Sequence, residues 1–237
     1  MTKPTMTTIP AHVTNQWSRY GLPFDYIVMH YVGAVSTARN NGTYYGNTPN
    51  IGASAHFFVD EKEIVASVPL DKAAGHCGVD YSNGRAPYWN GKGTYSTNRR
   101  SIGIEMCCKK RSDGSWYIEP ETVERTIPLV KWLMQEYGIP AQNVIRHYDV
   151  CWKNCPAPWV EHPEQWESFK RRITEQEDED MTRYKTVEEL PAPYRADIQT
   201  LIDKDKLRGK GGDLGLDLTE DMARVLIVCG RMQGVLE

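Results

Sequence analysis

The sequence has few cysteines and no long apolar run. Six cysteines in 237 residues are too sparse for a disulfide scaffold. No run approaches the roughly 20 apolar residues of a transmembrane helix, and residues 1–10 lack the apolar core of a secretory signal peptide. We therefore expect a soluble protein made in the reducing cytoplasm. Most of its cysteines should be free thiols, and a pairing of Cys151 with another cysteine is left open.

The chain also lacks a strong excess of charge of either sign. Its formal net charge is -3 and its isoelectric point is near 6.1. These values give no electrostatic reason to expect binding to nucleic acid or to an anionic membrane. A length of 237 residues suits one large domain with a substantial core, together with a small second one.

One segment, residues 146–156, combines a histidine, a lysine and a cysteine. Far upstream, His30 ends the apolar run 26–29. Zinc binds imidazole nitrogen and thiolate sulfur readily, and three protein ligands leave a fourth position for water, as in catalytic sites. Such a water ionises near neutral pH, and the metal polarises a carbonyl. We interpret His30, His147 and Cys155 as ligands of one zinc, although their spacing matches no common zinc motif and a buried histidine with an inert thiol is the commoner arrangement.

Periodicity predicts alternating strands and helices in the first three-quarters of the chain. Residues 36–50 are interpreted as a loop or irregular helix, and residues 81–97 as a long surface loop of the kind that often binds ligands. The expected strands are residues 26–30, 54–60, 63–68 and 98–107, the second and third forming a hairpin, and the expected helices are residues 121–137 and 166–173.

Glu105 lies within one of these predicted strands. Alternation places Ile102, Ile104 and Met106 on one face and Glu105 on the other. A carboxylate in an apolar strand is costly unless it is paired, hydrated or near a cation. A functional carboxylate and a solvated strand-edge glutamate are both compatible with this pattern. His56, inside another strand, is more often a packed structural histidine than a ligand.

These segments together resemble the zinc-dependent N-acetylmuramoyl-L-alanine amidases of the type 2 amidase family. That family includes phage endolysins and autolysins and is related to the peptidoglycan recognition proteins. The resemblance covers about residues 26–173, where the order and spacing of several short pieces match. The matching pieces are Val28-Met29-His30, the run from Ser54 to Asp60, Gly75-His76, the run from Asn98 to Glu105, His147, and Lys153-Asn154-Cys155-Pro156.

The resemblance implies a role for each matching residue. His30, His147 and Cys155 match the family's zinc ligands. Lys153 matches a residue that stabilises the oxyanion, and Glu105 matches a carboxylate that acts as general base. His56, His76, Asn98 and Arg99 match the substrate groove.

The chain departs from some relatives at Ala55, where they carry a catalytic tyrosine, which shifts the burden of base catalysis to Glu105. We also consider whether Arg99 or Arg100 pairs with a carboxylate of the stem peptide. A solvated surface pair is the commoner arrangement for two such arginines.

The fold implied is of the α/β class, a central mixed β-sheet flanked by helices, with a small helical C-terminal domain. The implied activity is hydrolysis of the amide bond between N-acetylmuramic acid and L-alanine in peptidoglycan, with Zn²⁺ as the cofactor. A non-catalytic peptidoglycan-binding module and a zinc peptidase acting on the stem peptide are the alternatives. Without a signal peptide, the protein is expected to reach the cell wall after holin-type lysis or by another non-classical route.

The domain boundaries expected are 1–174 for the catalytic domain, 175–185 for an acidic linker and 186–237 for a small helical domain. In the last, the pattern predicts helices over residues 194–207 and 219–232. The second helix is expected to bury Met222, Val225, Leu226 and Cys229. This pattern resembles one surface-layer-homology repeat, a wall-binding unit. Wall binding, homodimer formation and a passive stabilising extension remain open.

Overall fold

The computed structural model describes residues 2–78, 93–175, 183–208 and 215–236. The chain folds into two compact units, Met1–Glu175 and Gln176–Glu237. Each unit has its own hydrophobic core. Within the described residues, no helix is both long and apolar enough to cross a bilayer.

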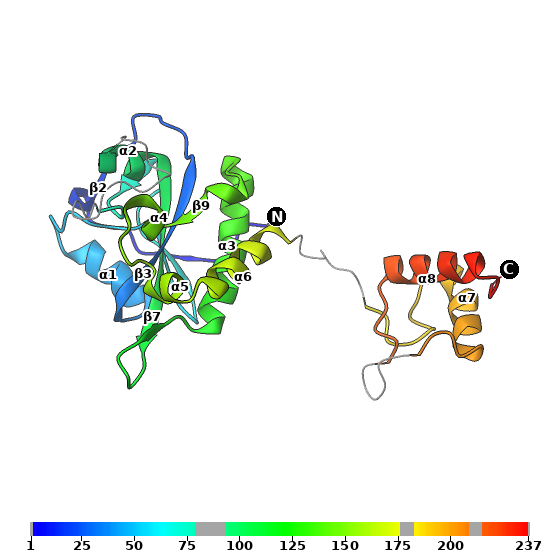
Figure 1. Ribbon diagram of the computed structural model, residues 1–237. Helices are drawn as coiled ribbons and strands as arrows, with labels where there is room; N and C mark the ends of the chain where they lie inside the picture. The colour runs from blue at the N-terminus through cyan, green and yellow to red at the C-terminus, as the bar shows by residue number, and fades with distance from the viewer. Residues whose placement is uncertain (1, 79–92, 176–182, 209–214, 237) are drawn as a thin grey trace. The chain divides into compact units, whose positions relative to one another are not determined.

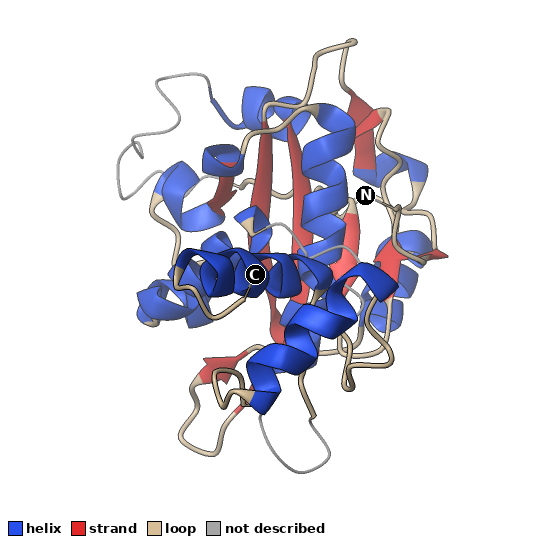
Figure 2. Cartoon of the chain, turned by 90° about the vertical axis from the view of Figure 1, so that its right-hand side faces the viewer, coloured by secondary structure: helices blue, strands red, loops and turns tan. Residues whose placement is uncertain are grey.

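A mixed β-sheet forms the centre of the first unit (Figures 1 and 2). The strand order is β1-β5-β4-β7-β3-β9, and β8 pairs with β7. Neighbours pair in parallel except β4 with β5 and β7 with β8. The strands of this sheet are β1 (Thr7–Thr8), β3 (Tyr26–Val35), β4 (Phe57–Val59), β5 (Ile64–Ala66), β7 (Ser101–Lys110), β8 (Trp116–Tyr117) and β9 (Val144–Arg146), and β2 (Gln16–Ser18) pairs with β6 (Lys72–Ala74) in a small separate sheet.

Helices cover both faces of the central sheet (Figure 1). On one face, α3 (Pro120–Tyr137) and α6 (Pro163–Thr174) pack against the apolar side chains of β3 and β7, including Ile102, Ile104 and Met106. On the other face, α1 (Ala38–Asn47) contacts β4 and β5. The remaining helices of this unit are η1 (Val13–Asn15), α2 (Gly93–Arg100), η3 (Ala141–Asn143), α4 (His147–Cys151) and α5 (Ala157–Glu161).

The two longest strands, β3 and β7, bring an imidazole and a carboxylate to the same face of the sheet. In the parallel pair of β3 and β7, His30 is in register with Glu105, and Glu105 is in register with Phe58 of β4. Residues in register on adjacent strands project their side chains from the same face. His30 and Glu105 are therefore neighbours on the face opposite α3 and α6.

Several element boundaries differ from those expected. The strand that begins at Tyr26 continues beyond His30 to Val35, although its side chains are buried only as far as His30. Residues 36–50 contain a regular helix, because the Thr37 side chain caps α1 by accepting from the N–H of Asn40. Residues 98–100 end α2 rather than begin β7. Most of the loop predicted over 81–97 lies outside the described residues.

The second unit packs two helices, α7 (Ala192–Asp203) and α8 (Glu220–Met232), around a small core. The prediction for the buried face of α8 was wrong for Met222, Val225 and Cys229, which are exposed, whereas Leu226 is partly buried against the core as expected. The buried residues of this helix are Ala223, Ile227 and Gly230. The reason is that this helix carries apolar residues on opposite sides, so periodicity does not single out one face. Close packing determines which side of α8 is buried. At Gly230 the helix lies so near Leu236 that an added Cβ would be only 2.8 Å from Leu236 Cδ1.

Candidate metal centre

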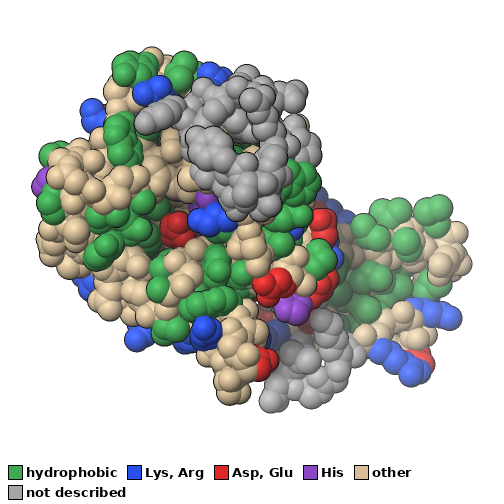
Figure 3. Space-filling view, turned by 60° about the vertical axis from the view of Figure 1, so that its left-hand side comes forward, with side chains coloured by type: hydrophobic (Ala, Val, Ile, Leu, Met, Phe, Trp, Pro, Cys, Tyr) green, Lys and Arg blue, Asp and Glu red, His purple; other side chains and the backbone are tan. Residues whose placement is uncertain are grey.

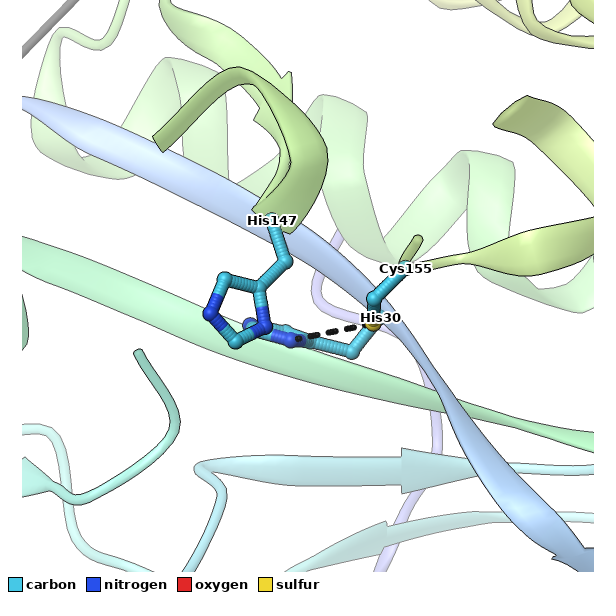
Figure 4. A group of neighbouring side chains, drawn as sticks. All are labelled: His30, His147 and Cys155. Carbon is cyan, nitrogen blue, oxygen red and sulfur yellow. Dashed lines mark hydrogen bonds between the residues drawn. The ribbon is translucent and has the colours of Figure 1, made fainter. Parts of the chain in front are cut away.

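Three side chains from distant parts of the chain, His30, His147 and Cys155, converge at one place (Figure 4). His30 lies on the same face of the sheet as Glu105. His30 comes from β3, His147 is the first residue of α4, and Cys155 lies in the loop between α4 and α5. One ligand atom from each lies within 4.8 Å of the other two, and all three side chains are buried. The structure thus assembles two imidazoles and one thiol at one point.

Local hydrogen bonds hold the loop that carries Cys155. Trp152 adopts a left-handed conformation (φ 65°) at the end of α4, which turns the chain back on itself. The backbone N–H of Tyr148 then donates to the carbonyl of Cys155 at 2.8 Å. This bond fixes the cysteine beside the first turn of α4, next to His147.

The hydrogen bonds of His147 leave one ring nitrogen available. Its Nε2 lies 2.9 Å from the carbonyl oxygen of Gly78, which can only accept, so Nε2 carries the proton. Its Nδ1 is buried and has no hydrogen-bond partner among the described residues. A metal-ligating histidine commonly donates its other ring N–H in this way. The unpartnered Nδ1 therefore has the environment of a metal ligand.

The spacing of the donor atoms also suits a tetrahedral ion. His30 Nδ1 and Cys155 Sγ are 3.7 Å apart (Figure 4). A nitrogen and a sulfur bound to the same tetrahedral zinc lie about 3.6 Å apart, given typical bond lengths. The donor set of two nitrogens and one thiolate is one that zinc favours.

Burial sets the charge state of each group. It lowers the pKa of His30 well below its ordinary value and that of His147 to about 4, so both imidazoles are neutral at pH 7 and can donate a lone pair. Burial raises the pKa of the Cys155 thiol well above its ordinary value. A bound divalent cation reverses this effect, because a coordinating thiol loses its proton.

A second group, His30, His76 and Cys77, also lies close enough together to hold a metal ion. Its contacts are shorter: His30 Nε2 lies 2.9 Å from His76 Nδ1, and Cys77 Sγ lies 3.2 Å from that same nitrogen. Two nitrogens on one tetrahedral zinc lie about 3.3 Å apart, and a nitrogen and a sulfur about 3.6 Å. These contacts therefore have the lengths of hydrogen bonds, and the first group is the better metal site.

Glu105 lies beside this centre. Its Oε2 is buried and has no hydrogen-bond partner within the described part of the chain. Burial raises the pKa of its carboxyl to about 8, and the positive charge of Lys153 acts in the opposite direction. Lys153 is exposed, and its charge also lowers the pKa of His30 and His147. Figure 3 shows acidic, basic and histidine side chains together near the middle of one face of this unit.

The other predicted site residues are engaged in internal contacts. His56 is fully buried, with Nε2 donating to the carbonyl of Lys72 at 3.2 Å and Nδ1 accepting from the N–H of Gly103 at 3.0 Å. These bonds are those of a packed structural histidine. Asn98 Oδ1 accepts from the backbone N–H groups of His76 at 3.2 Å and Cys77 at 2.8 Å.

The arginine pair is also bound within the unit. Arg99 donates from Nε to the carbonyl of Ser18 at 3.2 Å, and its guanidinium lies 4.6 Å from the ring centre of Tyr20. Arg100 forms an ion pair with Asp25. Neither arginine is therefore part of a simple solvated surface pair, and pairing of one of them with a stem-peptide carboxylate stays a prediction. Ala55 is buried beneath α1, so no base can act from that position.

Sequence reasoning missed two residues that contact the site residues, Gly78 and Ser101. Gly78 contributes a backbone carbonyl, which no residue type reveals. Ser101 accepts from or donates to His76 Nε2 at 3.3 Å. The alternation that places Ser101 and Gly103 on the same face as Glu105 was a signal that could have pointed to Ser101. Each of the six cysteines, Cys151 included, is a free thiol.

Comparison with known proteins gives consistent matches over the first unit. Residues 20–158, more than half of the chain, match the family described as N-acetylmuramoyl-L-alanine amidase. The N-acetylmuramoyl-L-alanine amidase BlyA of Bacillus subtilis is 34% identical over 166 residues, which are 67% of this chain and 44% of BlyA. The chain therefore spans less than half the length of such relatives.

Solved structures agree with these matches. The catalytic domain of XlyA superposes with a TM-score of 0.56 at 29% identity, covering 72% of this chain and 99% of that domain. A mutant endolysin from Bacillus subtilis gives a TM-score of 0.55 at 30% identity, covering 71% of this chain and 98% of the endolysin. The region shared with these structures is the first unit, which carries the cluster of His30, His147 and Cys155.

Proposed function

The chain belongs to the N-acetylmuramoyl-L-alanine amidase family, and from that premise we propose that it is a peptidoglycan hydrolase. The bond cleaved is the amide between the lactyl group of N-acetylmuramic acid and L-alanine. The observation that carries the proposal is the convergence of His30, His147 and Cys155 beside Glu105. Amide hydrolysis requires an attacking water, a proton for the leaving amine and compensation for charge on the carbonyl oxygen.

We propose that zinc is the metal held by His30, His147 and Cys155. The unpartnered Nδ1 of His147 and the 3.7 Å separation of His30 Nδ1 and Cys155 Sγ support this assignment. When bound, zinc supplies Lewis-acid chemistry, which polarises a carbonyl and lowers the pKa of water. Within the described residues this cluster contains three protein ligands, a number characteristic of catalytic zinc sites.

Glu105 is the group proposed to move protons. Burial raises the pKa of this carboxyl above its ordinary value, which makes the carboxylate a stronger base. In the proposed reaction, Glu105 accepts a proton from the attacking water as the oxygen bonds to the carbonyl carbon. It then delivers that proton to the amide nitrogen as the C–N bond breaks. Its Oε2 has no hydrogen-bond partner within the described residues, so its acceptor capacity is unused.

Lys153 is proposed to stabilise the negative charge that develops on the carbonyl oxygen. Replacing it with methionine is expected to lower kcat about 10²–10³-fold with little change in KM, because the lost charge acts in the transition state. Turbidity loss of purified cell walls measures the rate. Lys62→Met removes an exposed charge elsewhere and should retain the wild-type rate. If Lys153→Met raised KM alone, Lys153 would be a binding residue rather than an oxyanion stabiliser.

Mass spectrometry of the fragments released from a defined peptidoglycan tests the reaction itself. An amidase releases free stem peptides that begin at L-alanine and leaves intact glycan strands. A zinc peptidase would shorten the stems instead, and a binding module would release nothing. The presence of Glu105, Lys153 and Cys155 together favours the enzyme over the binding module.

We further propose a catalytic domain over residues 1–174, an acidic linker over 175–185 and a wall-binding or dimer-forming domain over 186–237. The exposed face of α8 supports a role in association, since Met222, Val225, Val228 and Met232 are 46%, 61%, 55% and 83% exposed. Peptidoglycan is the proposed partner, reached after release from the cell by lysis or another non-classical route. Neither nucleic acid nor membrane is expected as a partner.

Introducing charge on the exposed face of α8 should weaken association without changing catalysis. In the full chain, Val225→Lys with Met232→Lys is expected to reduce cosedimentation with intact walls, or to shift a dimer to a monomer in analytical ultracentrifugation. Cleavage of a soluble muropeptide should stay at the wild-type rate. If wall binding and mass were both unchanged, the unit would be a passive extension.

A further inference from the structure

A chain of buried hydrogen bonds leads from the backbone of α2 to the candidate metal ligands His30 and Cys155. The hydroxyl of Ser101 donates to the carbonyl of Thr97 at 2.6 Å, and Ser101 Oγ lies 3.3 Å from His76 Nε2. His76 Nδ1 lies 2.9 Å from His30 Nε2, and His30 Nδ1 faces Cys155 Sγ. All these side chains are buried, so the polar groups are paired with one another in place of water.

The direction of each proton in this chain follows from its first member. A carbonyl oxygen can only accept, so the Ser101 proton is used by Thr97, and Ser101 Oγ offers only lone pairs to His76. His76 Nε2 therefore carries a proton and donates it. A buried imidazole away from any acid is neutral, and a neutral imidazole has a single N–H, so His76 Nδ1 is an acceptor.

The same reasoning fixes the proton on His30. Because His76 Nδ1 accepts, His30 Nε2 must carry the proton and donate it. His30 Nδ1 is then left with its lone pair directed at the place where the ion would lie. The thiol of Cys77, 3.2 Å from His76 Nδ1, can add a weak S–H donor to the same acceptor, which is consistent with this direction.

The position of the His76 ring is built into the fold. It lies against β7 at Gly103, where an added Cβ would be 2.4 Å from His76 Cγ. Asn98 holds the backbone of His76 and Cys77 by accepting from both N–H groups. The ring is therefore constrained from the sheet side and from α2, and neither constraint involves the metal-type ligands.

We propose that His76 is a positioning residue that fixes the tautomer of His30, so that Nδ1 of His30 is held ready as a metal ligand. The inference rests on the proposed metal centre and deepens it. The two histidine ligands would be oriented by different partners: His147 by the backbone carbonyl of Gly78, and His30 by the side chain of His76. Of the two, only the second can be altered by substituting a side chain.

Metal affinity, measured on the full chain without substrate, tests this role. Asparagine and leucine are close in size, but only asparagine keeps an acceptor near the position of Nδ1. His76→Leu is expected to weaken Zn²⁺ binding by about 10–100-fold, the usual cost of losing a partner of a metal-ligating histidine. His76→Asn should recover most of that affinity. Competition with a chromophoric chelator gives the dissociation constants, and Co²⁺ spectra report the geometry of the site.

Two further variants separate orientation from general damage. Gly103→Ala keeps every imidazole but displaces the His76 ring, and it should weaken Zn²⁺ binding in the same direction as His76→Leu. His162→Ala removes an exposed histidine elsewhere and should leave the affinity unchanged. Thermal unfolding of the metal-free proteins checks that each variant is folded.

The possible outcomes separate the positioning role from the metal centre itself. Equal Zn²⁺ affinities for His76→Asn and His76→Leu, both matching the wild type, would overturn the positioning role and leave the metal centre intact. A wild-type chain that binds neither Zn²⁺ nor Co²⁺ would overturn the metal centre and the positioning role together.

Discussion

Glu105→Gln is expected to slow the hydrolysis of purified cell walls by about 10²–10⁴-fold, the usual contribution of a positioned acid–base group. Glutamine has the size of glutamate but cannot accept and return a proton. Among the described residues, neither Ala55 nor His56 can replace it, because Ala55 stands where a catalytic tyrosine would be needed and His56 has both ring nitrogens bound to the backbone. Initial rates of turbidity loss measure the effect.

Zinc content provides the control for this variant. Glu105 is not one of the three clustered donors, so Glu105→Gln should retain the wild-type amount of zinc in elemental analysis. Glu136→Gln, which changes an exposed residue of α3, should retain both zinc and activity. If Glu105→Gln hydrolysed walls at a near-normal rate, another group would have to carry the proton.

Cys155→Ser is expected to bring the zinc content of the dialysed protein to background and to abolish hydrolysis. A serine hydroxyl in this buried site does not ionise as a zinc-bound thiol does, so only two imidazoles would remain as effective ligands. Thermal unfolding gives an independent measurement. Zinc should raise the midpoint of the wild type but not that of Cys155→Ser, because a ligand stabilises only the state that binds it.

The matched control is Cys229→Ser, which alters an exposed thiol in the second unit. It should keep the zinc content, the midpoint shift and the hydrolysis rate of the wild type. Cys155→Ser protein that still bound one zinc per chain would contradict the ligand assignment. A chelator that inactivated the wild type, with recovery on adding Zn²⁺, would agree with it.

Local patterns predicted the longer elements of the first unit, such as β3, β7 and α3, but not the way they meet. Alternation correctly assigned Ile102, Ile104 and Met106 to the core side of β7. It could not reveal that Glu105 is in register with His30, because the register of two parallel strands about 75 residues apart depends on tertiary packing. Nor could it predict which side of α8 is buried, since that helix carries apolar residues on opposite sides.

For the candidate site, too, part could be predicted from the sequence and part required the structure. The three clustered donors come from β3, α4 and a loop, and their spacing follows no short motif, so family resemblance carried that prediction rather than the sequence pattern alone. The role proposed for His76 required atomic positions, because the direction of a hydrogen bond depends on which partner can only accept. His76 itself was identified from the sequence, but only as a residue of the substrate groove.

The matching of His30 with Glu105 restricts how the central strands can change in length. Side chains alternate between the two faces of a strand, so deleting one residue between Gly103 and Glu105 would turn the carboxylate towards α3 and α6. Removing two residues would return the Glu105 carboxylate to its original face, but it would then lie two residues out of register with His30. Natural variants of this segment are therefore expected to differ by substitution, with insertions and deletions confined to the chain beyond the ends of the strand.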